Sequence, residues 1–509
     1  MSERGRRERS MGGRTMSGRT MSGRRTSERA MLGRALRAGD ERRLFARLAP
    51  LAAALLLAGC ANLIPTYERP AAPVASTYPP ESTPAGVAGV QAAGDLEWQR
   101  FFADARLKRL IDIALQNNRD LRIAVLNIEQ ARATYQVRRA DELPTVGAGA
   151  NVQRQPGSNG NLTNTYAVGL AVSSYELDLF GRIRSLSQAA LAQYLGTAEA
   201  RKAVQISLIA SVANTYLSML ADDELLRVTR QTLVTREDSL RLTKLKFDNG
   251  AASELDYRQA ESLLESARAT LAQSVRQRAL DEDALVLLIG QPAPVDLPAP
   301  MLLDGGQVST DLPAGLPSDL LERRPDIRAA EQQLLAANAN IGAARAAFFP
   351  RISLTGNFGT ASTQLSGLFK GGSFAFTGAG QLLEPIFDAG RNQANLEVAR
   401  VSRDIAAAQY ERAIQTAFRE VADALAGRAT LGEQLRAQLA QANAEAVRYR
   451  LSDLRYRNGA SSYLEVLDAQ RALFAAQQAV VQVQAAQVQN LVTLYRVLGG
   501  GWKESAAGG

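Results

Sequence analysis

The side chain best suited to covalent chemistry is a single cysteine, Cys60, in a chain of 509 residues that contains no histidine. Cys60 ends the sequence Leu-Ala-Gly-Cys at residues 57–60, which follows an apolar run with three arginines in front of it. A basic region, a short apolar run and small residues before a cysteine are typical of a bacterial lipoprotein signal. We therefore expect residues 1–59 to be a signal peptide with a basic leader and Cys60 to carry lipid, with sorting to the outer membrane.

The remaining residues do not indicate an enzyme. Histidine is the usual general base and a common metal ligand, and the chain has none. No phosphate-binding loop or paired metal motif appears. We expect no catalytic residues, no metal site and no cofactor apart from the covalent lipid on Cys60.

The formal charge of +8 suggests a nucleic-acid partner until its distribution is considered. Residues 1–59 hold 14 arginines and 5 acidic residues, a net charge of +9, so the remainder has a net charge of −1 (8 − 9). Once the leader is removed, no basic surplus is left to attract phosphate, and we expect no nucleic-acid partner.

An Asn-Gly turn occurs twice in the chain, in two copies of one longer sequence pattern. Asn249-Gly250 recurs as Asn458-Gly459, a displacement of 209 residues, and the register continues from Gly290 to Gly499. Upstream the displacement is 206, as between Pro144 and Pro350. A duplication of this length indicates one architectural unit used twice. We assign a first repeat to residues 98–300 and a second repeat to 301–502, after a tether at 60–97 and before a disordered tail at 503–509.

Each repeat is predicted to contain a very long helical hairpin. Residues 182–248 and 392–457 lack proline, and each stretch is followed by the turn at Gly250 or Gly459 and a return helix. A helix of about 50 to 60 residues would be about 75 to 90 Å long, far beyond an ordinary globular helix. Such helices on their own are typical of a coiled-coil scaffold.

Each repeat is also predicted to contain two strands. Large apolar residues alternate with small or polar ones in residues 166–173 and 352–358, and residues 145–155 and 373–383 are their partners. Strands of about ten residues suit a tilted membrane strand. Four strands cannot close a barrel in lipid without unpaired edges, so several chains must combine their strands.

These motifs resemble the TolC-like outer-membrane factor family, in its lipoprotein branch that serves RND-type tripartite efflux systems. The segments that carry the resemblance are YELDLFGR (175–182), RRPDIRAAE (323–331), ARAAFFPR (344–351), PIFDAGR (385–391), YLEVLDAQR (463–471) and LGGGW (498–502). The resemblance implies a mostly α-helical homotrimer in which a 12-stranded outer-membrane β-barrel continues into a periplasmic α-helical tunnel. It also implies a passive, gated duct for small molecules, with a periplasmic adaptor and an inner-membrane RND-type transporter as partners. The alternative is a lipoprotein scaffold that bridges the periplasm without conducting.

The same resemblance places a gate at the periplasmic tips formed by the turns at Gly250 and Gly459. It implies a role there for six residues: Leu464 and Asp468 as pore rings with Glu465 close by, Asp256 as a tether, Tyr456 as an aromatic that holds the closed helices together, and Arg471 as an (i, i+3) ion-pair partner of Asp468. The alternative for each charged side chain is an ordinary solvated position on a helix. The exported substrate is not indicated, although seven methionines, five of them in the leader region, weakly disfavour a copper or silver role.

Overall fold

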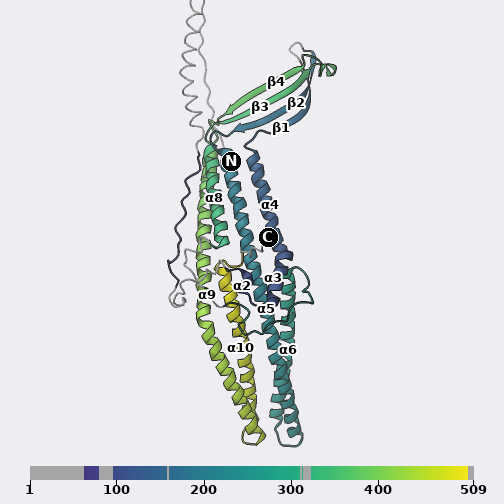
Figure 1. Ribbon diagram of the computed structural model, residues 1–509, viewed down its shortest axis with the longest axis vertical. Coiled ribbons are helices and arrows are strands. Elements are labelled where there is room, and N and C mark those ends of the chain that lie inside the picture. Colours follow the sequence, from purple (N-terminus) through teal and green to yellow (C-terminus); the bar gives the residue numbers. More distant parts are fainter. Residues whose placement is uncertain (1–61, 79–95, 157–159, 310–311, 313–322, 503–509) are drawn as a thin grey trace, which may run out of the picture. The chain divides into compact units, whose positions relative to one another are not determined.

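The computed structural model describes residues 62–78, 96–156, 160–309, 312 and 323–502. Cys60, the leader at 1–59 and the tail at 503–509 lie outside these residues. Residues from Asn62 onward form one compact unit. That unit contains helices and one antiparallel sheet, as expected for a mostly α-helical chain with membrane strands (Figure 1).

The same order of elements occurs twice along the chain. A helix is followed by two strands, a very long helix and a return helix. The helices of the first half are α4 (Arg119–Ala140), α5 (Arg182–Asp248) and α6 (Glu254–Ile289), and those of the second half are α8 (Pro325–Ala346), α9 (Arg391–Arg457) and α10 (Tyr463–Val497). The bounds of α4 and α8 differ by 206 residues and those of α5 and α9 by 209, so the structure keeps both displacements that the sequence contains.

The long helices α5 and α9 each contain 67 residues, more than the 50 to 60 that we expected. At 1.5 Å per residue each is about 100 Å long. Both end at a glycine in the left-handed region, with φ 71° at Gly250 and 72° at Gly459, where a side chain would be strained. The N–H of Ala251 donates to Lys246 O at 2.7 Å, and that of Ala460 donates to Arg455 O at 2.8 Å, so both turns close in the same way.

The four strands form one antiparallel sheet in the order β1-β2-β3-β4. They are β1 (Val146–Pro156), β2 (Leu162–Leu177), β3 (Arg351–Ser362) and β4 (Phe374–Leu383). Strands β2 and β3 join the two halves of the chain, and β1 and β4 are left as the edges. The sheet is strongly curved (Figure 1).

The main hydrophobic core lies where the short N-terminal helices meet α5, α9 and α10. Phe101, in α2 (Trp98–Phe101), stacks on Tyr495 of α10 with ring centres 4.1 Å apart. The buried carboxylate of Asp104 caps α3 (Ala105–Asn117) and accepts a hydrogen bond from the Tyr216 hydroxyl at 2.9 Å. Because Asp104 is fully hydrogen-bonded, its burial is compatible with a stable core.

Residues 62–78, the described part of the predicted extended tether, also contact the helical body. The segment is extended, without helix or strand, but the Glu331 carboxylate of α8 accepts hydrogen bonds from the Tyr67 hydroxyl at 3.0 Å and from Arg69 at 2.7 and 3.0 Å. Asn338 donates to Pro65 O at 2.8 Å. A composition rich in Pro, Ala and Ser suggested a tether, but Tyr67 and Arg69 supply specific contacts that composition does not reveal.

Among the described residues, only α5 contains an 18-residue stretch apolar enough to cross a membrane as a helix. Of that stretch, 61% is buried inside the protein. Its apolar character is therefore explained by packing within the helical body.

A pair of carboxyl groups links α5 and α6 and makes stability depend on pH. Burial, and then the hydrogen bond to and the charge of Asp281, raise the pKa of Asp222 to about 7 against the opposing charge of Arg278. The folded chain therefore holds this proton more tightly than the unfolded chain, whose aspartates have a pKa near 4. The resulting stability is present below about pH 4 and is lost as the pH rises through about 7.

We expect the wild-type protein to lose about 1 kcal/mol of stability between pH 6 and pH 8, and Asp222→Asn to lose much less. Thermal unfolding of both proteins at the two pH values measures this difference. The control is Asp238→Asn, on the same helix at an exposed ion pair with Arg241. Equal pH dependence in wild type and Asp222→Asn would contradict the assignment.

Candidate functional site at the hairpin tips and the sheet

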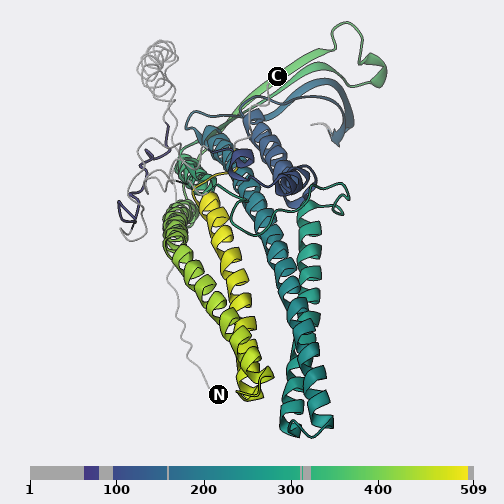
Figure 2. The same ribbon diagram turned by 60° about the horizontal axis from the view of Figure 1, so that its bottom comes forward.

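The tips of the two hairpins contact each other. Lys246, near the end of α5, places its Nζ 3.9 Å from the centre of the Tyr456 ring on α9, and that ring lies 5.2 Å from the ring of Tyr463. Figure 2 shows the two hairpins as separate helix pairs that end in these tips. Tyr456, predicted to hold the helices together, thus lies between the two hairpins of one chain.

A small cluster of buried side chains continues this contact above the tips. It contains Ala260, Leu263, Tyr463, Val466 and Leu467, with Leu240, Tyr449 and Tyr456 partly buried against them. Gln470 of α10 donates to the Ser239 hydroxyl of α5 at 3.0 Å. The Arg236 guanidinium lies 5.1 Å from the Phe474 ring. A few polar and aromatic contacts therefore connect α5 of the first hairpin to α10 of the second.

Asp468 forms its ion pair with Arg448 of α9, at 2.7 Å, and not with Arg471 as we expected. Among the described residues no ion pair joins Arg471 to Asp468. The antiparallel helix α9 places Arg448 directly opposite Asp468, so this carboxylate joins the two helices of one hairpin. Arg471 instead lies near Arg236, whose pKa is lowered by burial and then by the charge of Arg471.

Glu465 pairs with Arg455 across the second hairpin, at 3.3 Å. Leu464, beside it, is largely exposed, as is its counterpart Leu255 in the first hairpin. The position of Leu464 and Glu465 on the pore stays a prediction.

Asp256 caps its own helix in the single chain. Its Oδ2 accepts hydrogen bonds from the Ser253 hydroxyl at 2.8 Å and the Ser253 N–H at 3.2 Å, while its own N–H donates to Ser253 Oγ at 3.1 Å. This is a capping box, which the sequence Ser-Glu-Leu-Asp at 253–256 indicates and which our sequence analysis missed. Its predicted role as a gate tether stays a prediction, and any substitution of Asp256 also removes a helix cap.

The two faces of the sheet differ in chemistry. Because alternate residues point to opposite faces, the pairing register places large apolar side chains on one face, including Val168, Leu170, Phe358 and Phe376. The other face carries small or uncharged polar residues, including Gly149, Asn151, Gly169, Asn357 and Thr377. Of the residues in the four strands, only Arg154, Glu176 and Arg351 are charged. An apolar face and a small, wettable face are what a barrel wall between lipid and water requires.

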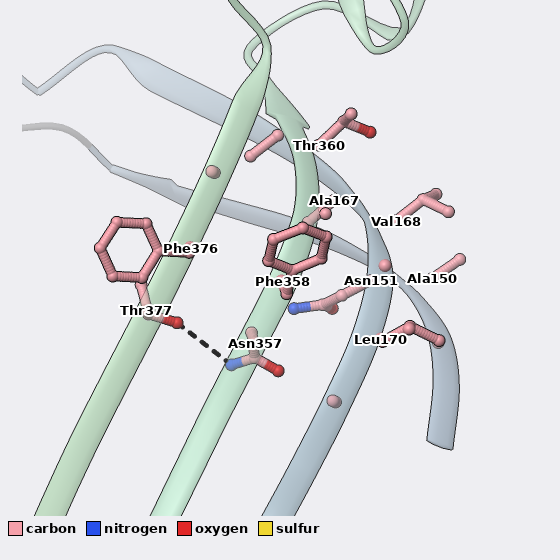
Figure 3. A pocket seen from close by; sticks show the side chains of 16 residues that line it. Ala150, Asn151, Ala167, Val168, Leu170, Asn357, Phe358, Thr360, Phe376 and Thr377 are labelled. Atoms are coloured by element: carbon pink, nitrogen blue, oxygen red, sulfur yellow. Dashed lines mark hydrogen bonds between the residues drawn. The ribbon is translucent and has the colours of Figure 1, made fainter. Parts of the chain in front are cut away.

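A shallow hollow of about 350 Å³ marks the middle of the sheet, where Gly149, Gly169 and Gly359 are paired across three strands (Figure 3). Nearby, Asn357 donates a hydrogen bond to the Thr377 hydroxyl at 3.3 Å. The hollow is lined mostly by backbone and small side chains and contains no charged group. Within the described residues, no group of three or more His, Cys, Asp or Glu side chains is arranged to hold a metal ion.

Comparison with known proteins connects these features. The model of the family described as outer membrane efflux protein matches residues 110–291 and 316–500, one match in each repeat. The chain belongs to the outer membrane efflux protein family. The predicted TolC-like relationship is therefore confirmed.

Relatives and solved structures agree with this assignment. The toluene efflux pump outer membrane protein TtgC of Pseudomonas putida is 48% identical over 463 residues, covering 89% of this chain and 94% of TtgC. The outer membrane protein OprJ of Pseudomonas aeruginosa is 48% identical over 464 residues, covering 89% of this chain and 96% of OprJ. The crystal structure of the open state of the Neisseria gonorrhoeae MtrE outer membrane channel superposes with a TM-score of 0.79, at 44% identity over 87% of this chain and 99% of MtrE.

The efflux protein is thus an outer-membrane component of an efflux system and not an enzyme, as the sequence predicted. Its antiparallel sheet, with one apolar and one wettable face, is the part suited to the membrane. Its long hairpins are the part suited to the aqueous compartment below.

Proposed function

We propose that this outer membrane efflux protein is a lipid-anchored homotrimeric duct, gated at the tips of its hairpins, that completes a tripartite pump. In this proposal three chains supply twelve strands to one barrel, and their long helices continue it as a tunnel through the periplasm. A periplasmic adaptor and an inner-membrane RND-type transporter deliver the cargo. The observation that carries the proposal is the face of the sheet with small and polar side chains, because a scaffold without a pore has no need of it.

The open edges of the sheet support a trimer. Within the part of the chain that the structure describes, β1 and β4 pair on one side only, and in lipid the backbone groups on their outer sides must be paired. Three copies give twelve strands, an even number as in bacterial barrels of this kind. The fold that this chain shares with MtrE, an outer membrane channel, supports a pore-forming assembly.

The contacts at the tips support a gate. The two hairpins of one chain are held together near their ends by a few contacts, among them Lys246 with Tyr456 and Gln470 with Ser239. Such contacts are individually worth about 1 kcal/mol, so a modest force from a bound partner separates them. Rings formed by three copies of Glu465 and Asp468 would favour cations.

The docked N-terminal segment supports lipidation at Cys60. Arg345, in the last turn of α8, donates to Leu63 O at 3.1 Å, only three residues after Cys60. Helix α8 leads directly into β3. Leu63, which is bound to the last turn of α8, therefore lies near the base of the sheet. The chain that follows the predicted lipid site is thus held against the end of α8 that leads into the sheet.

Single-channel conductance of the mature protein in planar bilayers tests the proposal. We expect a small, cation-selective conductance, and a severalfold loss of cation selectivity in the double variant Glu465→Gln with Asp468→Asn. Glu282→Gln, an exposed carboxylate far from the tips, is the control. Absence of any conductance from folded, inserted trimers would refute the duct and leave the scaffold.

A further inference from the structure

The far end of the sheet has only basic charges. The strands leave the helices at the base of the sheet and reverse direction at its far end, beyond Pro156 and beyond Ser362 (Figure 1). Between residues 143 and 175 and between residues 352 and 383, the only charged residues are Arg154 and Lys370. This part of each chain therefore has a net charge of +2 and no carboxylate.

The charges at the base of the sheet, in contrast, are paired with one another. Arg182 binds the Glu176 carboxylate at 2.7 Å, and Arg351 lies 3.8 Å from the same carboxylate. Arg154 and Lys370 are exposed, and within the described part of the chain neither of them forms an ion pair. The two basic side chains at the far end are thus available to an anion from outside the chain.

Arg154 lies on the apolar face of the sheet. Side chains alternate along β1, so Arg154 shares a face with Ala150 and Val152. The neighbouring pair on this face, toward the base, is Val152 with Tyr166. An arginine on the lipid-facing side of a barrel is costly at the middle of the bilayer and inexpensive near its border, where the side chain reaches the headgroups.

The length of β1 places Arg154 at the outer border of the membrane. Arg154 is eight residues beyond Val146, the first residue of the strand. This is about 26 Å along the strand, or about 20 Å across the bilayer for a strand tilted by about 40°. Tyr166 and Phe374 lie on the same face toward the base, as expected for the aromatic girdle that marks a membrane border.

We propose that Arg154 and Lys370 bind the phosphate groups of lipopolysaccharide, the anionic glycolipid of the outer leaflet. This inference rests on the proposed barrel and names a lipid that it binds. The lipid A part of lipopolysaccharide carries its phosphates just above the acyl chains, which is the level of Arg154. A guanidinium donates two parallel hydrogen bonds to a phosphate, and an ammonium adds a compact positive charge.

In the closed barrel, each site takes its two basic residues from two copies. Strands β1 and β4 are the edges of the sheet, so closure pairs β1 of one copy with β4 of the next. Arg154 on β1 and Lys370 just before β4 then flank the same seam. One phosphate of a lipid at this seam faces a cation from each copy.

Titration of purified trimers with lipid A tests the site. Native mass spectrometry of the mature protein in detergent gives the Kd for each bound lipid. We expect Arg154→Gln with Lys370→Gln to weaken lipid A binding by roughly tenfold or more, and Arg154→Lys alone to retain most of it. The control, Arg241→Gln with Arg436→Gln, removes the same charge from exposed ion pairs on the long helices and should bind as wild type does.

Lipid A without its phosphates makes the test specific. Removing the phosphates should weaken binding to the wild type much more than binding to the double variant, because the variant has already lost the groups that bind them. Equal weakening in both proteins, or equal losses in the double variant and the control, would overturn the proposed site and leave the trimeric duct intact.

Two further results separate the remaining outcomes. If the double variant loses affinity for phosphatidylglycerol as much as for lipid A, the site takes any anionic phospholipid and the assignment to lipopolysaccharide is wrong. Folded protein that remains monomeric in the same spectra would overturn the trimeric barrel itself, and with it a site shared between copies.

Discussion

Alanine in place of Gly359 is expected to reduce the amount of assembled channel in the outer membrane by roughly tenfold or more. A Cβ at this position would lie 2.2 Å from Val168 O and 2.5 Å from the Cα of Gly169. Gly169 is its direct partner across the strands, and a Cβ there would lie 2.3 Å from Phe358 O. The neighbouring atoms are backbone, which cannot move without disturbing the pairing between β2 and β3.

The matched control is Gly356→Ala, on the same strand, where the nearest atom to an added Cβ is Thr377 O at an ordinary 3.8 Å. Heat-modifiable mobility on gels and yield from purified outer membranes measure the assembled fraction. Since β2 and β3 are the strands that join the repeats, damage here affects the whole sheet. Equal yields from Gly359→Ala and Gly356→Ala would show that the sheet relaxes around the added methyl group.

Removing the contacts between the hairpins is expected to open the channel. In Lys246→Ala with Gln470→Ala, the cation–π contact to Tyr456 and the hydrogen bond to Ser239 are both lost. The loss amounts to about 1 to 2 kcal/mol in each chain, which changes an equilibrium roughly five- to thirtyfold. We expect single-channel conductance, or the open fraction of each channel, to rise accordingly.

Arg241→Ala is the control for this double variant, because Arg241 lies on the same helix as Lys246 and forms an exposed ion pair with Asp238. Exposed pairs of this kind contribute little to stability. Thermal unfolding should confirm that the double variant remains folded. An unchanged conductance in a folded, inserted double variant would show that the gate lies elsewhere.

The sequence predicted the framework of the fold well, because repetition made each local pattern visible twice. Strand alternation in residues 166–173 marks β2, and the absence of proline between residues 182 and 248 marks α5. The turns at Gly250 and Gly459 were predictable since a left-handed residue after a long helix favours glycine. The helix lengths were underestimated, although the proline-free stretch at residues 182–248 already spans the whole of α5.

The side-chain partners at the tips were less predictable. The (i, i+3) spacing within α10 predicted Arg471 as the partner of Asp468. In the structure the partner is Arg448, on the antiparallel helix α9. This pairing depends on how α9 and α10 are aligned after the turn that joins them. The spacing of residues within one helix gives no information about that alignment. The capping box of Asp256 was a local pattern and could have been identified from the sequence alone.

The equal length of α5 and α9 restricts how the gene can change. One inserted residue moves everything beyond it by 1.5 Å and turns it by about 100°. An insertion in α5 alone would carry Lys246 away from Tyr456. An insertion in α5 without one in α6, or in α9 without one in α10, would misalign the two helices of that hairpin. Substitutions can accumulate independently in the two halves. Changes of length are compatible with this structure only when the four hairpin helices α5, α6, α9 and α10 change together.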